Sequence, residues 1–139
     1  MVDRRWRTAG LKSWLALSSE AAQRVHPHKT LMITEKIDNI TFQPQANVYF
    51  GGKFISHGIL LADGTKKSVG VILPATLTFN TGAPEIMECV AGSCEYKLAG
   101  SDAWAKSSAG ESFSVPGNST FDIRVAPGVD AYHYICHFA

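Results

Sequence analysis

The stretch from residue 110 to residue 121, GESFSVPGNSTF, constrains the fold of this chain more than any other. Apolar and polar residues alternate on both sides of its Pro116–Gly117 pair, as in strands that bury one face. Proline cannot donate to a strand ladder and glycine tolerates positive φ, so the pair ends one strand and turns the chain. The sequence therefore predicts two strands joined at a tight corner, as in a small β-barrel. The apolar residues expected to point inward are Phe113, Val115, Phe121, Ile123 and Val125.

From Met32 onward the chain consists of short apolar runs separated by turn residues, without helical periodicity. We predict a hairpin turn at Asp63–Gly64 and a second hairpin around Gly92–Ser93. About ten short strands with frequent turns predict one all-β domain, a barrel or sandwich, over residues 32–139. The expected strands are 54–61, 68–73, 76–80, 85–91, 94–98, 111–115, 120–125 and 132–138, with Trp104 in a further short strand.

Composition excludes several classes of protein. A length of 139 residues is enough for one domain with a single core. Three cysteines without paired spacing argue against a disulfide framework and for a reducing compartment, so we expect a cytoplasmic protein. A formal net charge of +1 gives no general case for nucleic-acid binding, and no apolar run approaches the length of a membrane span.

Residues 1–31 differ from the rest of the chain in charge. They hold six Lys/Arg residues against two acidic residues, whereas residues 32–139 hold seven against ten. The segment is helix-like at best, and its apolar run from Trp14 to Leu17 is too short for a secretory signal. We expect a dispensable basic extension, with Met32 as the start of the folded protein. A basic tail that binds a surface is the alternative.

Gly110 and Pro116 stand six positions apart, and this spacing resembles the second conserved motif of cupins. In the first cupin motif, Gly92 fits the closing glycine and Glu85, seven residues earlier, fits the acidic metal ligand. The resemblance implies a cupin-type double-stranded β-helix, also called a jelly roll.

The histidine positions of the two cupin motifs are occupied here by Phe79, Thr81 and Phe121. Only Glu85 remains of four expected ligands, and one carboxylate cannot replace the three or four donors that a transition metal needs. We therefore predict a metal-free site, in which an aromatic, mostly apolar pocket replaces the metal.

Six further motifs occur in order and narrow the resemblance. They are Asn47-x-Tyr49-Phe50-x-Gly52-Lys53, Ser68-Val69-Gly70-Val71, Phe79-x-Thr81, Pro84-Glu85-x-Met87, Val115-Pro116-Gly117-x-Ser119-x-Phe121 and Tyr134-x-Cys136. Over residues 45–139 the chain resembles the pyrimidine/purine nucleoside phosphorylase family of small single-domain cupins. The resemblance implies phosphorolysis of purine and pyrimidine ribonucleosides to free base and ribose 1-phosphate, with broad base tolerance. It also implies inorganic phosphate as co-substrate, no further cofactor, and a cytosolic homodimer.

The candidate site residues follow from the chemistry of such a reaction. Phe79 and Phe121 offer faces on which any base can stack, and Met87 and Tyr134 complete the predicted nucleoside contacts. Glu85 can hold ribose hydroxyls or stabilise positive charge at C1′, so it is the main candidate catalytic residue. The candidate donors for phosphate are Thr81, also taken as catalytic, Ser119 and Lys66.

Other interpretations stay open. The two phenylalanines can be ordinary core residues, Glu85 can cap a turn, and Lys66 can lie in a solvated loop. A non-catalytic cupin that binds nucleosides or bases would use the same pocket without turnover. A metal-dependent cupin would need Glu85 together with a histidine of the last strand, His133 or His137.

Overall fold

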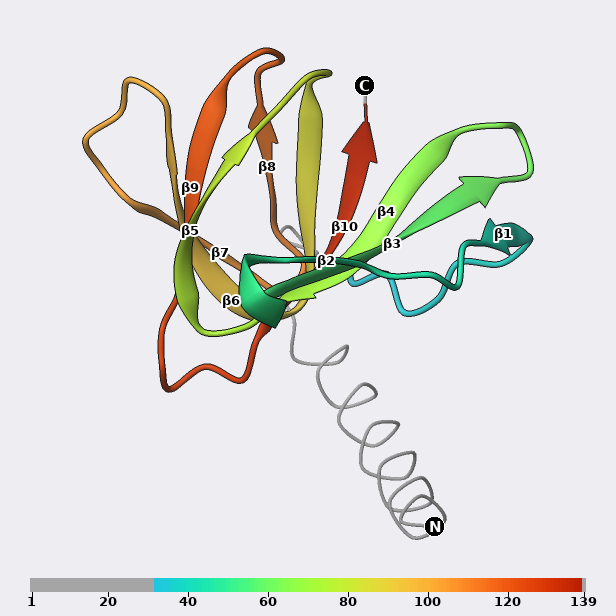
Figure 1. Cartoon of the computed structure of the whole chain (residues 1–139), viewed down its shortest axis with the longest axis horizontal. Helices are drawn as coiled ribbons and strands as arrows, with labels where there is room; N and C mark the ends of the chain where they lie inside the picture. Colours follow the sequence, from blue (N-terminus) through green and yellow to red (C-terminus); the bar gives the residue numbers. More distant parts are fainter. Residues whose placement is uncertain (1–31, 139) are drawn as a thin grey trace, which may run out of the picture. The chain divides into compact units, whose positions relative to one another are not determined.

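The computed structural model describes residues 32–138 of the protein (Figure 1). The predicted basic extension, residues 1–31, lies outside the described residues. The elements are β1 (Ile40–Phe42), β2 (Asn47–Tyr49), the 3-10 turn η1 (Phe50–Gly52), β3 (Phe54–Leu61), β4 (Lys66–Ile72), β5 (Ala75–Asn80), β6 (Glu85–Leu98), β7 (Ala105–Ser108), β8 (Ser112–Val115), β9 (Thr120–Val125) and β10 (Tyr132–Phe138). No helix in this part of the chain is long and apolar enough to cross a bilayer.

The strands form one continuous antiparallel sheet that curls into an open half-barrel (Figure 1). The main order is β1-β3-β4-β10-β6-β9-β5, with β2 paired to β3 and both β7 and β8 paired to β6. Nearly all of the predicted strands are present, and the all-β prediction is confirmed. The short strands β1 and β2 were not predicted, and Trp104 lies just before β7.

The predicted hairpin around Gly92–Ser93 is wrong, because β6 runs unbroken through this point. Its first half pairs with β10 and β8, and its second half pairs with β7 and β9. Gly92 has a φ of 74°, and a Cβ atom built there would lie 1.8 Å from the Ala131 carbonyl oxygen. The pairing with β10 also shifts register between His133 and Tyr134. The glycine therefore bends one long strand from one half of the sheet into the other, as bulges do.

The Pro116–Gly117 corner connects the two halves of the sheet rather than two paired strands. β8 pairs with β6 in one half, and β9 pairs with β5 and with the far part of β6 in the other. The predicted alternation is confirmed on both sides of the corner. The inward-facing residues are all buried: Phe113, Val115, Phe121, Ile123 and Val125.

The hairpin predicted at Asp63–Gly64 is confirmed between β3 and β4. Gly64 has a φ of 90°, and the Asp63 carboxylate accepts a hydrogen bond from the Thr65 backbone N–H at 2.9 Å. This hairpin extends the sheet beyond the core, and it places β3 and β4 opposite β5 and β9 across the concave face of the half-barrel (Figure 1).

Candidate functional site

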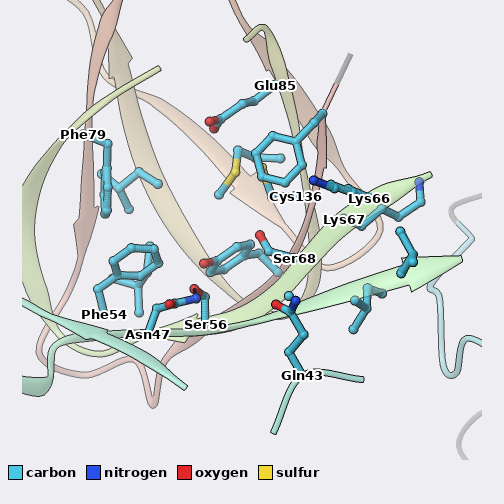
Figure 2. Close-up of a pocket in the computed structure, with 18 of the residues that line it drawn as sticks. Gln43, Asn47, Phe54, Ser56, Lys66, Lys67, Ser68, Phe79, Glu85 and Cys136 are labelled. Carbon is cyan, nitrogen blue, oxygen red and sulfur yellow. Dashed lines mark hydrogen bonds between the residues drawn. The ribbon is translucent and has the colours of Figure 1, made fainter. Parts of the chain in front are cut away.

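The concave face of the half-barrel holds a cavity of about 510 Å³. This volume lies within the range of roughly 300–1,000 Å³ that small-molecule sites occupy. Figure 2 shows side chains from both halves of the sheet pointing into it. The lining residues that matter for its chemistry are Gln43, Asn47, Phe54, Ser56, Lys66, Lys67, Ser68, Phe79, Glu85, Met87, Phe121, Tyr134 and Cys136.

Aromatic rings form one wall of the cavity. The Phe79 and Phe121 rings are stacked with centroids 5.4 Å apart, because the two residues face each other across β5 and β9. Phe54, from β3, meets Phe79 edge to face at 5.0 Å and lies 6.2 Å from Tyr134. Such a wall offers a flat apolar surface to a planar ligand.

Glu85 begins β6 and points into the cavity from the end opposite Phe54 and Ser56 (Figure 2). Its carboxyl group is half-buried, and loss of water raises its pKa, although a hydrogen bond from the Cys136 thiol opposes this. Among residues 32–138, no basic side chain lies within ion-pair distance of Glu85. The charged carboxylate is therefore held at a cost, which is typical of a functional group rather than of a turn cap.

The groups beside Glu85 are neutral hydrogen-bond donors. Burial, followed by the nearby Glu85 charge, raises the pKa of the Cys136 thiol to about 12. Burial also raises the pKa of the Tyr134 hydroxyl, and the neighbouring Cys136 and Glu85 act in the same direction. The thiol stays protonated at neutral pH, and Cys136 is therefore a small buried residue rather than a reactive thiolate.

A second polar group lies at the opposite end of the cavity. The Asn47 amide donates a hydrogen bond to the Ser56 hydroxyl at 3.3 Å, and Ser56 in turn lies beside the Tyr134 hydroxyl, whose pKa it lowers. Tyr134 reaches this position because residue 70 is glycine: a Cβ atom there would lie 2.8 Å from the tyrosine oxygen. Asn47 is exposed at the rim, whereas Ser56 and Tyr134 are buried.

Two lysines at the start of β4 supply positive charge on a third side of the cavity (Figure 2). Lys66 is exposed. The ammonium group of Lys67 is hydrogen-bonded to Nδ1 of His137, whose Nε2 lies 2.8 Å from the Glu88 carboxylate. Lys67 is therefore tied to its neighbours, and Lys66 is the better placed of the two to meet an anion.

Six of the predicted site residues line this cavity. They are Lys66, Phe79, Glu85, Met87, Phe121 and Tyr134.

Thr81 and Ser119 are the exceptions, because the structure places both outside the cavity lining. The Thr81 hydroxyl donates to the Pro116 carbonyl at 2.7 Å and accepts from the Ser119 backbone N–H at 3.0 Å. These contacts brace the Pro116–Gly117 corner. Thr81 and Ser119 are therefore part of the corner, Ser119 through its backbone, and their contact with a substrate stays a prediction.

Several lining residues were missed as site residues. Phe54, Ser56 and Gly58 stand two apart on β3 and share the face that points into the cavity. A serine and a glycine among apolar residues on one strand face signalled a polar, open surface. Ser68 and Asn47 were noted only as motif positions, and Gln43 had no signal at all.

The described residues contain no group of three His, Cys, Asp or Glu side chains that could hold a metal ion. His133 and His137 lie on the face of β10 opposite Tyr134 and Cys136 and do not line the cavity. A metal-free reaction stays a prediction.

Comparisons with known proteins point in one direction. A family model described as pyrimidine/purine nucleoside phosphorylase matches residues 44–138. A pyrimidine/purine nucleoside phosphorylase of Polaromonas naphthalenivorans (strain CJ2) is 83% identical over 108 residues, which are 78% of this chain and 100% of that protein. The protein of the same name from Paracidovorax citrulli (strain AAC00-1) is 72% identical over 107 residues, 77% of this chain and 99% of the relative.

A crystal structure of a protein of unknown function from Acinetobacter sp. ADP1 has the same fold, with a TM-score of 0.73 and 44% identity. The superposition covers 76% of this chain and 100% of the Acinetobacter protein. Family model, sequence relatives and fold agree over the part of the chain that builds the cavity. This chain belongs to the pyrimidine/purine nucleoside phosphorylase family.

Proposed function

We propose that the protein catalyses phosphorolysis of purine and pyrimidine ribonucleosides in the cavity of the half-barrel. The observation that carries the proposal is one cavity with three functional sides: an aromatic wall, the half-buried Glu85 carboxylate, which has no cation beside it among residues 32–138, and the exposed Lys66. The names of the closely similar relatives support the same activity. The glycosidic bond from C1′ to the base nitrogen breaks, and the base keeps the electron pair and takes up a proton. A phosphate oxygen forms the new bond to C1′.

The aromatic wall accounts for tolerance of different bases. Phe54, Phe79 and Phe121 present ring faces, and stacking on a ring requires no particular arrangement of donors and acceptors. Purines and pyrimidines can then be held in the same place.

Glu85 is the proposed catalytic residue. Its carboxylate has given up part of its hydration and has no cation beside it among the described residues. Positive charge that develops on the sugar as the glycosidic bond breaks would be stabilised there more strongly than the neutral substrate is. The neutral Cys136 thiol keeps the carboxylate in place.

Lys66 is the proposed phosphate contact. Replacing it with methionine should raise the KM for phosphate by roughly tenfold, since a lost charged hydrogen bond is worth about 1.5–3 kcal/mol. The KM for inosine should change little, because the lysine lies away from the aromatic wall. Lys97, whose ammonium group lies 5.1 Å from the Trp104 ring centroid, supplies the control: Lys97→Met should leave both values unchanged. Equal increases in both KM values for Lys66→Met would contradict the assignment.

Three further properties belong to the same proposal. The reaction needs no metal, since the cupin ligand positions are Phe79, Thr81 and Phe121. A homodimer is supported by exposed apolar side chains near the β1 and β2 edge, which a partner surface would cover. They are Phe42, Val48, Tyr49 and Phe50. Three free buried thiols fit the reducing cytoplasm.

A panel of nucleosides incubated with and without phosphate tests the proposal. Release of base from inosine, adenosine, uridine and cytidine should require phosphate and survive prolonged chelation. Binding of nucleosides without base release would instead favour the non-catalytic, ligand-binding cupin. Loss of activity on chelation, restored by a stoichiometric transition metal, would favour the metal-dependent one.

A further inference from the structure

The end of the cavity opposite Glu85 carries a hydrogen-bonded row that phosphorolysis does not require. Asn47, Ser56 and Tyr134 contact one another in that order, from the rim to the buried floor. Figure 2 shows Asn47 and Ser56 at the far end from Glu85, next to Phe54. A base stacked on the aromatic wall, with its ribose at Glu85, would direct the edge remote from the sugar toward these residues. In both purines and pyrimidines that edge is the Watson–Crick edge.

The row has a property that follows from its groups. Serine and tyrosine hydroxyls each donate and accept, whereas an asparagine amide has one accepting end and one donating end. In the structure the Asn47 nitrogen donates to the Ser56 oxygen, at 3.3 Å, which leaves the amide oxygen as an acceptor. If the amide turns by half a rotation, its oxygen accepts from the Ser56 hydroxyl, and Tyr134 donates to Ser56 in place of accepting. Both contacts, Asn47 with Ser56 and Ser56 with Tyr134, survive the reversal.

We infer that Asn47, held by Ser56, reads the Watson–Crick edge of the base and can present either an acceptor or a donor to it. The inference rests on the proposed function and adds the group that selects the base. An amide oxygen suits the ring N–H of uracil, hypoxanthine and guanine or the amino groups of adenine and cytosine. An amide N–H suits the carbonyls and ring nitrogens beside them. Broad base tolerance then has a polar cause in addition to the tolerance of stacking.

Burial of the inner part of the row supports this role. Ser56 is 6% exposed and Tyr134 is 3% exposed, so their hydroxyls have little access to water. Burial raises the pKa of Tyr134, so its hydroxyl keeps its proton and can donate. Asn47 itself is exposed at the rim, where an incoming base can reach it. Gly70 leaves the space that the tyrosine oxygen occupies.

Asn47→Asp replaces the amide with a carboxylate, so the side chain that faces the base can accept hydrogen bonds but cannot donate them. Guanine presents two adjacent donors, its ring N–H and its amino group, whereas hypoxanthine presents only the ring N–H. The variant should therefore raise the ratio of kcat/KM for guanosine to that for inosine by about tenfold, within the range of a bidentate contact. Asn47→Ala should lower kcat/KM for both nucleosides by similar factors. Ser56→Ala should do the same, because the amide loses its anchor but can still turn.

Gln43 supplies the matched control for an added charge. It is a second exposed amide in the cavity lining, and its side chain lies over Gly58. Gln43→Glu should leave the guanosine-to-inosine ratio within twofold of the wild-type ratio. The same tenfold change in Gln43→Glu, or a ratio within twofold of wild type in Asn47→Asp, would overturn the inference.

Calorimetric binding of guanosine and inosine without phosphate separates this inference from the proposed function. Wild-type protein that releases no base with phosphate contradicts phosphorolysis. The affinity ratio of Asn47→Asp still tests the base edge in that case: a rise of about tenfold in favour of guanosine supports it, and an unchanged ratio overturns it.

Discussion

Glu85→Gln is expected to lower kcat for inosine and uridine by roughly tenfold or more, the scale of a lost electrostatic contact in a transition state. Glutamine keeps the size of the side chain and one acceptor but removes the charge that would stabilise the developing cation. The KM for nucleoside should change less than kcat, because the contact strengthens only as the glycosidic bond breaks. Initial rates at saturating phosphate measure both values.

Glu88→Gln is the matched control for the same loss of charge. Glu88 lies on the same strand but does not line the cavity. Its carboxylate oxygens are instead bonded to Thr34 at 2.6 Å and to His137 at 2.8 Å. The kcat of the Glu88→Gln variant should stay close to that of the wild type. A Glu85→Gln variant that turns over at the wild-type rate would show that the carboxylate only caps the start of β6.

Glu85→Gln should also stabilise the fold at neutral pH. Burial raises the pKa of Glu85 above its ordinary value, so ionisation costs free energy in the folded state and the group favours folding only at low pH. Wild type should therefore melt below Glu85→Gln at pH 7, and the two should converge as the pH falls below the ordinary glutamate pKa. The sequence alone does not reveal this effect, because the loss of water around Glu85 depends on the strands that enclose it.

Gly92→Ala is expected to destabilise the protein by roughly 3 kcal/mol or more, because strain at positive φ adds to a backbone clash. The φ of 74° disfavours any side chain, and the new Cβ would lie 1.8 Å from the Ala131 carbonyl oxygen. Relief requires a shift of β10 against β6, which also carry Tyr134, Cys136 and Glu85. Chemical denaturation measures the loss of stability.

Gly100→Ala separates the two contributions. Gly100 has a φ of 81°, but a Cβ atom there meets nothing within 4 Å. Its substitution should cost only the conformational strain, about 1–2 kcal/mol. Equal losses for the two variants would mean that the strand relaxes around Gly92 and that the bend does not depend on the close approach to Ala131.

The strands with one buried face could be predicted from the sequence because alternation of apolar residues reports directly on burial. β3, β9 and β10 were predicted with their observed bounds. Gly92 shows the limit of this reasoning. A glycine between two apolar runs fits a hairpin and a bent strand equally well, and the choice depends on Ala131, which is far along the chain.

The site was predictable to a similar degree. The cupin motif positions placed Glu85, Phe79 and Phe121 in one site, and all three line the cavity although they lie on three different strands. Thr81 and Ser119 were assigned to phosphate because hydroxyls suit it, but the Thr81 hydroxyl is bonded within the corner, where Ser119 contributes its backbone. Local sequence does not reveal where a hydroxyl finds its partner. Phe54 and Ser56 belong to the site because β3 lies across the cavity from β5, and local sequence does not reveal this arrangement.

The central claim is that phosphate, and not water, receives the sugar. Phosphorus NMR of a reaction containing inosine, phosphate and the protein measures this directly. Phosphorolysis predicts that ribose 1-phosphate appears in equimolar amount with hypoxanthine and that Glu85→Gln slows both together. Release of hypoxanthine with free ribose and unchanged phosphate, or no release at all, would contradict it.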